Sequence, residues 1–164
     1  MFKKILLALA VALPLGAMAQ KIGVVEADQI MQLMPETKSA QDALAASSKV
    51  FEDEFGKLNT EIDNKYAEFQ GLAADTPASI KERRQQEIQD LAQRIQAFQQ
   101  NAQNELAKQQ QQLMQPIQEK LINAIKAVGA EQGLTMILPD GVAIYTGGDV
   151  IDVTPAVKAK LGIK

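Results

Sequence analysis

Residues 88–128 read IQDLAQRIQAFQQNAQNELAKQQQQLMQPIQEKLINAIKAV, with an apolar side chain at nearly every third or fourth position. This stripe covers 40 residues in 11 steps, about 3.6 residues per step, which is the period of a straight α-helix rather than of a left-handed coiled coil. The 55 residues from Pro77 to Glu131 therefore predict a rod of roughly 80 Å. Because no compact domain of this mass is so long, the rod is expected to project from the rest of the molecule.

A second apolar stripe comes before the first and predicts a helix that packs beside it. Its members are three or four residues apart: Phe51, Phe55, Leu58, Ile62, Tyr66 and Phe69. Between the stripes, Asp75-Thr76-Pro77 is typical of a helix cap followed by a first-turn proline. Residues 36–131 are thus expected to form an antiparallel helical hairpin arm that reverses near residues 71–77. Pro116 is expected to bend or interrupt the second helix, and Gly133 to end it.

Signals for strands occur near the two ends of the chain. Lys21 to Val25 is a short β-branched run. Leu134 to Leu138 and Val142 to Thr146 flank Pro139-Asp140-Gly141, which predicts a β-hairpin with Leu134, Met136 and Leu138 on one face. Thr154-Pro155 is expected to open a last helix that bears Val157 and Leu161.

The two end segments, residues 20–35 and 132–164, would form one small body of roughly 50 residues. A body of this size buries too little surface to be stable without disulfides, metals or association. The chain has no Cys or His, so association is the remaining route. We therefore expect an α+β, mostly α fold whose β-body is completed by oligomerisation through a shared core: Ile22, Val24, Leu134, Met136, Val142 and Ile144.

The first nineteen residues have the pattern of a cleavable secretory signal peptide. Lys3 and Lys4 precede an apolar run of about eleven residues, which ends in Ala17-Met18-Ala19. Cleavage is expected after Ala19 and export to the periplasm follows. Removal lowers the 17 basic residues to 15 and leaves the 20 acidic residues, so the mature chain has a net charge of -5.

The composition excludes several functions. Without Cys or His there is no thiolate nucleophile, histidine acid or base, or Cys/His zinc site. Gly147-Gly148-Asp149 lacks the glycine spacing of a phosphate-binding loop and is interpreted as a turn. An excess of acidic residues excludes a nucleic-acid footprint. We expect no catalytic residue, cofactor or metal. A glycosidase that uses two carboxylates is the enzymatic alternative, but nothing in the sequence nominates such a pair.

The apolar stripes of the arm are the best candidates for a binding surface. A hairpin of two helices has little interior, so part of its apolar surface is expected to stay uncovered, and such surface on an exported rod marks a binding face. The candidates for contact with a bound protein are Phe51, Phe55, Tyr66, Phe69, Leu72 and Phe98. For any single one of them, packing between the two helices remains the more frequent role.

The order of these elements resembles the Skp/OmpH family of periplasmic chaperones. The matching motifs span essentially the whole mature chain: Lys21-Ile22-Gly23-Val24-Val25, Ala27-Asp28-Gln29-Ile30, Pro116-Ile117-x-x-Lys120-Leu121-x-x-Ala124-Ile125-x-x-Val128, Gly133-Leu134-Thr135-Met136-Ile137-Leu138, Val142-Ala143-Ile144-Tyr145 and Asp149-Val150-x-Asp152-Val153-Thr154. The resemblance implies a jellyfish-like homotrimer with a common β-body and three helical arms around a cavity. It also implies an ATP-independent holdase for unfolded outer-membrane β-barrel proteins.

One departure from that family concerns charge. The best-known members are strongly basic and are thought to attract acidic clients and lipopolysaccharide, whereas this mature chain is acidic. Attraction of lipopolysaccharide is therefore expected to be weak. The alternative interpretation is a structural coiled-coil scaffold or spacer of the cell envelope, which would bind one folded partner with a defined stoichiometry.

Overall fold

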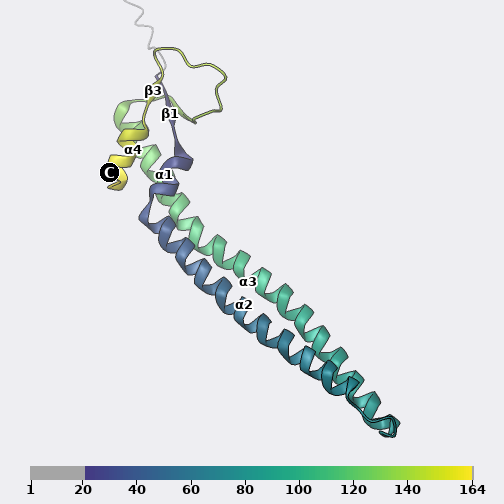
Figure 1. Cartoon of the computed structure of the whole chain (residues 1–164). Coiled ribbons are helices and arrows are strands. Elements are labelled where there is room, and N and C mark those ends of the chain that lie inside the picture. Colours follow the sequence, from purple (N-terminus) through teal and green to yellow (C-terminus); the bar gives the residue numbers. More distant parts are fainter. Residues whose placement is uncertain (1–20, 164) are drawn as a thin grey trace, which may run out of the picture.

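The computed structural model describes residues 21–163 and is mostly helical with one small sheet, as expected. The expected signal peptide and its cleavage site after Ala19 lie outside the described residues. Figure 1 shows two long helices running away from a small body that holds the strands and the short helices. In chain order the elements are β1 (Ile22–Val25), α1 (Ala27–Leu33), α2 (Pro35–Gln70), α3 (Ala78–Gln132), β2 (Met136–Pro139), β3 (Ile151–Asp152) and α4 (Thr154–Leu161).

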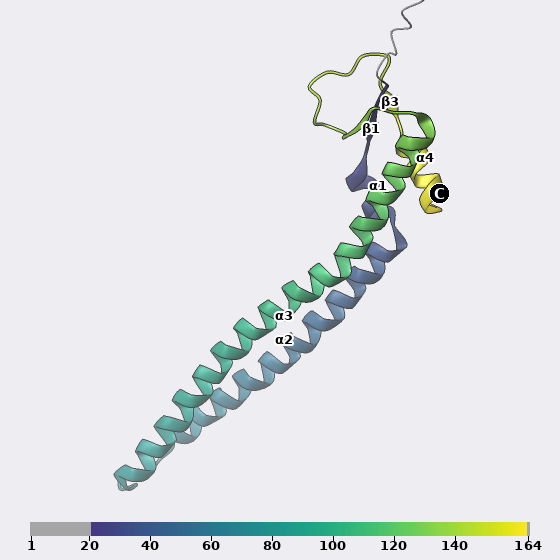
Figure 2. The same ribbon diagram turned by 180° about the vertical axis from the view of Figure 1, so that it is seen from behind.

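The helices α2 and α3 lie side by side and antiparallel in both ribbon views (Figures 1 and 2). Pro35 occupies the first turn of α2, where its missing N–H costs nothing. Pro77 precedes α3 in an extended conformation, so the helix begins one residue later than expected. Gly133 ends α3, as predicted, with a φ of 63°, the left-handed conformation that is common at helix ends.

Pro116 lies inside α3, which continues through it without interruption. The expected interruption at this residue is therefore wrong, whereas the bend expected as the other outcome stays a prediction. Ile117 and Leu121 follow Pro116 directly and are almost fully buried. Their packing stabilises the helix beyond the position where the proline removes a hydrogen-bond donor.

The sheet has the strand order β2-β1-β3, and both outer strands run parallel to β1. The predicted β-hairpin is therefore wrong, since Val142 to Thr146 belongs to no strand. A turn does form after β2, because the Val142 amide donates to the Pro139 carbonyl and Gly141 has a φ of 81°. The chain then crosses to the other edge of β1, where β3 lies. Because β2 and β3 run in the same direction, the chain must return to the starting end of the sheet between them, which takes a long connection.

The core of the body lies between the sheet, α1, α4 and the end of α3. Its most deeply buried side chains are Ile30, Met34, Val128, Val153 and Val157. The burial of Val157 agrees with the helix predicted at the end of the chain, although α4 begins at Thr154 rather than after it.

Candidate functional site

The outer face of the sheet gathers three of the six residues expected in the oligomer body. Ile22 pairs with Met136, and Val24 pairs with Leu138. Gly23 and Val25 alternate with them and are buried on the core side. Residues that pair across two strands point to the same side of a sheet, and side chains along a strand alternate between sides. The outer face therefore consists of Ile22, Val24, Met136 and Leu138. Met136 is half exposed there.

The other three residues of that expected set lie elsewhere. Leu134 precedes β2 and packs against the core side of the sheet, beside Gly23. Val142 and Ile144 lie in the connection between β2 and β3, where they are 63% and 107% exposed, and the adjacent Tyr145 is 85% exposed. The single shared face that alternation predicted for Leu134 and Met136 is therefore wrong, because the strand starts only at Met136.

A pair of aromatic rings marks the middle of the arm. Phe51 on α2 and Phe98 on α3 meet edge to face, with ring centroids 6.0 Å apart and an interplanar angle of 62°. Both rings are only partly buried. Between them and Phe55 lies a groove of about 270 Å³, which we call the mid-arm groove, lined by Ser48, Phe51, Glu52, Phe55, Phe98, Gln99, Ala102, Gln103 and Leu106.

The groove exists because a small residue occupies the stripe of α3 at this level. Ala102 is buried, but its methyl group cannot fill the space beside two phenylalanines. Towards the tip, Leu58 and Leu91 are larger and bury almost completely. A second hollow, of about 450 Å³, shares Phe51, Phe98 and Ala102 with the groove. Another molecule can therefore reach the two rings both through the mid-arm groove and through this second hollow.

The remaining arm candidates lie nearer the tip. Tyr66 is 47% exposed, whereas Phe69 and Leu72 are partly buried near the reversal. Some of the charged side chains near them are paired within the arm. Glu87 receives ion pairs from Arg84 at 3.0 Å and Lys65 at 3.3 Å, and these two hydrogen-bonded cations, Arg84 first, lower the pKa of the Glu87 carboxyl.

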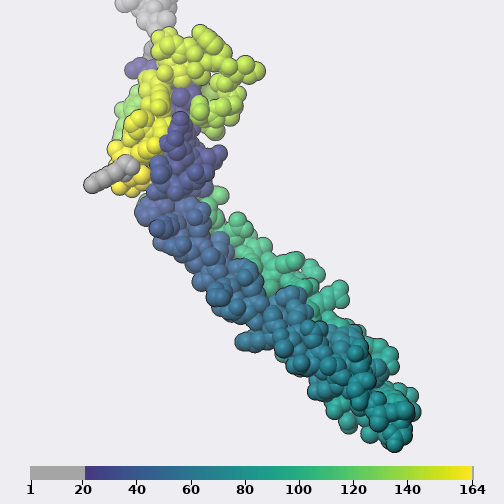
Figure 3. Space-filling view, in the orientation of Figure 1, coloured from purple at the N-terminus to yellow at the C-terminus, as the bar shows by residue number. Residues whose placement is uncertain are grey.

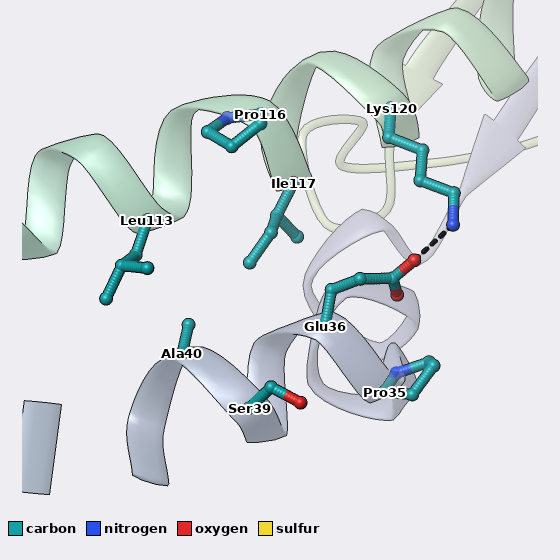
Figure 4. A pocket seen from close by; sticks show the side chains of 8 residues that line it. All are labelled: Pro35, Glu36, Ser39, Ala40, Leu113, Pro116, Ile117 and Lys120. Atoms are coloured by element: carbon teal, nitrogen blue, oxygen red, sulfur yellow. Dashed lines mark hydrogen bonds and ion pairs between the residues drawn. The ribbon is translucent and has the colours of Figure 1, made fainter. Parts of the chain in front are cut away.

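A larger hollow, of about 540 Å³, lies at the base of the hairpin where α2 begins (Figure 4). Leu113 and Ile117 project from α3 towards Ala40 on α2, and Glu36 reaches across to Lys120 at the rim. The hydrogen bond from Lys120 is the main cause that lowers the pKa of the Glu36 carboxyl. This ion pair therefore links the start of α2 to the last third of α3.

These surfaces can bind other molecules through apolar contact. Within residues 21–163, no cluster of three or more carboxylates is placed to hold a metal ion. The same part of the chain contains no helix with the length and apolar character needed to cross a membrane. The space-filling view shows a long, narrow arm below the body (Figure 3).

Comparison with known families supports this description. The family model described as outer membrane protein (OmpH-like) matches residues 21–161. The chain belongs to the OmpH-like family. The match includes the sheet, both long helices and all but the last residues of the described chain, so the resemblance noted in the sequence motifs is confirmed.

The OmpH-like fold is also found in a crystal structure from Caulobacter crescentus CB15. That protein is described as a candidate outer membrane chaperone (OmpH-like). It is 19% identical to this chain, with a TM-score of 0.71 over 86% of this chain and 82% of the other. At this identity the likeness establishes the fold. No curated protein matches the chain.

Proposed function

We propose that this protein is an ATP-independent holdase of the periplasm that binds unfolded outer-membrane β-barrel proteins and prevents their aggregation. The observation that carries the proposal is the partly exposed aromatic pair Phe51–Phe98, with its adjoining groove, on a narrow two-helix arm. Apolar surface of this kind can hold the sticky segments of a non-native chain. Membership of the OmpH-like family and the fold shared with the chaperone candidate from Caulobacter support the same function.

The proposed active form is a homotrimer. Residues 20–35 and 132–164 would form the shared body, and residues 36–131 would form one arm of each protomer. The outer face of the sheet offers Ile22, Val24, Met136 and Leu138 to a second copy. Val142 and Ile144 are exposed apolar residues of the same body and would be covered in the assembly.

The proposed mechanism needs no energy source. Three arms would enclose a cavity in which many weak contacts hold the client and keep its unpaired strand edges from those of other chains. Release would follow from favourable folding into the membrane. Because the mature chain is acidic, contact would depend on apolar arm surface, and lipopolysaccharide would bind weakly.

Dilution of an unfolded porin tests this proposal. With the mature protein in several-fold trimer excess, light scattering by porin aggregates should fall strongly. Unchanged scattering would refute the holdase function. Binding of a single folded envelope protein at fixed stoichiometry, without protection of the porin, would favour the scaffold or spacer instead.

A further inference from the structure

The surroundings of the mid-arm groove are rich in carboxylates. From Lys49 to Lys65 on α2 and from Glu87 to Lys108 on α3 there are eight acidic and five basic residues. Three of the five cations are engaged within the arm: Lys49 with Asp53 at 3.5 Å, Lys57 with Glu54 at 3.1 Å and Lys65 with Glu87 at 3.3 Å. The positive charge of this region is therefore largely neutralised by its own neighbours.

Five carboxylates of the same region make no ion pair within the described part of the chain. They are Glu52, Glu61, Asp63, Asp90 and Glu105. Two cations of the region, Arg94 and Lys108, also make no ion pair within the described residues. Glu52 matters most, because it lines the mid-arm groove beside Phe51 and Phe55. The groove thus has an apolar floor, a single carboxylate, Glu52, beside Ser48 on its α2 side, and an amide wall on α3 that includes Gln99 and Gln103.

We propose that the mid-arm groove selects segments of unfolded polypeptide that carry an aromatic or large aliphatic side chain close to lysine or arginine. The apolar side chain would contact Phe51, Phe55 and Phe98, and the neighbouring cation would lie within a Debye length, about 8 Å, of Glu52. This inference rests on the proposed holdase function and adds a preference for positively charged client segments. An acidic segment of equal apolarity would meet repulsion at the same place.

Two unfolded peptides of equal length and aromatic content test the preference, one with lysines and one with glutamates between the aromatic residues. Fluorescence anisotropy with the full mature protein should show about five-fold tighter binding of the basic peptide at low salt, because exposed ion pairs are weak individually. The advantage should shrink as salt is raised. Equal affinities, or tighter binding of the acidic peptide, would overturn the proposal.

Variants locate the effect on the arm. Glu52→Gln should remove most of the difference between the peptides, while Glu61→Gln and Glu119→Gln, which each remove a carboxylate outside the groove, should retain it. A preference that survives Glu52→Gln would overturn the assignment to this groove. Porin aggregation is measured in parallel. If the protein prevents porin aggregation but shows no preference between the peptides, only the charge preference is refuted. If it neither prevents aggregation nor binds either peptide, the holdase function is refuted as well.

Discussion

Gly23 lies directly against Leu134, so that a Cβ at position 23 would stand 2.8 Å from Leu134 Cδ1. The same Cβ would approach Ile137 and Val153 at 3.2 and 3.3 Å. Because Gly23 has no side chain, β1 can lie close to the side chains of Leu134, Ile137 and Val153 at this point.

The first prediction follows from this contact. Gly23→Ala should lower the free energy of unfolding by about 2 kcal/mol, because the added methyl group overpacks the core. Gly56→Ala is the matched control, since nothing lies within 4 Å of its Cβ position in α2. That change should stabilise the helix by about 1 kcal/mol. Denaturant unfolding measures both, and effects of the same sign would contradict this packing.

The second prediction concerns the joint between β1 and α4. The Glu26 amide donates to Thr154 Oγ1 at 2.9 Å, and Thr154 is 4% exposed. Thr154→Val removes the acceptor and leaves a partly buried N–H without a partner, which should cost about 1–2 kcal/mol of unfolding free energy. Thr154→Ser retains the hydroxyl and should cost less. Equal losses for the two variants would assign the effect to packing rather than to the hydrogen bond.

The third prediction is a pH dependence at the base of the arm. The hydrogen bond from Lys120 lowers the pKa of Glu36 below its usual 4.5. A lowered folded-state pKa gives stability that is present above the unfolded pKa and is lost as pH falls through the folded pKa. The difference in unfolding free energy between the parent and Glu36→Gln should therefore shrink on acidification below about pH 4.5. A difference that grows under acid would contradict the ion pair.

The fourth prediction addresses the proposed oligomer. Met136→Glu places a charge on the outer face of the sheet, next to Ile22, and should shift the sedimentation mass towards the single chain, because a charge buried without a partner is costly. Val50→Glu changes an equally apolar residue, 66% exposed on α2, and should leave the mass unchanged. A trimer that survives Met136→Glu would place the interface elsewhere.

The fifth prediction concerns the aromatic pair of the arm. Phe98→Ala removes one ring of the proposed binding surface. Loss of one aromatic contact with the client, worth roughly 1 kcal/mol, should lower the affinity for an unfolded porin about five-fold. Ile122→Ala, at a residue 47% exposed on α3, serves as the control. Circular dichroism checks that the arm remains helical in both variants. Equal affinities of the two variants for the porin would show that Phe98 is not part of the binding surface.

The long helices could be predicted because their signal is local. An apolar residue every 3.6 positions along 40 residues is satisfied by one helix, and Pro35, Pro77 and Gly133 mark where helices begin and end. The sequence also indicates that two such stripes so close together should pack on each other. It does not reveal the groove beside Phe51, which depends on Ala102 facing two aromatic rings across the hairpin.

The strand pairing was decided by the tertiary structure. Alternation identified Ile22 and Met136 as strand residues, but they are partners across more than a hundred residues of chain, and no local pattern specifies so distant a neighbour. A turn after Pro139 favoured an antiparallel hairpin, yet the edges of β1 are taken by β2 and by Ile151–Asp152, both parallel. Helices follow from neighbours in sequence, whereas a sheet depends on which segments the packed core brings together.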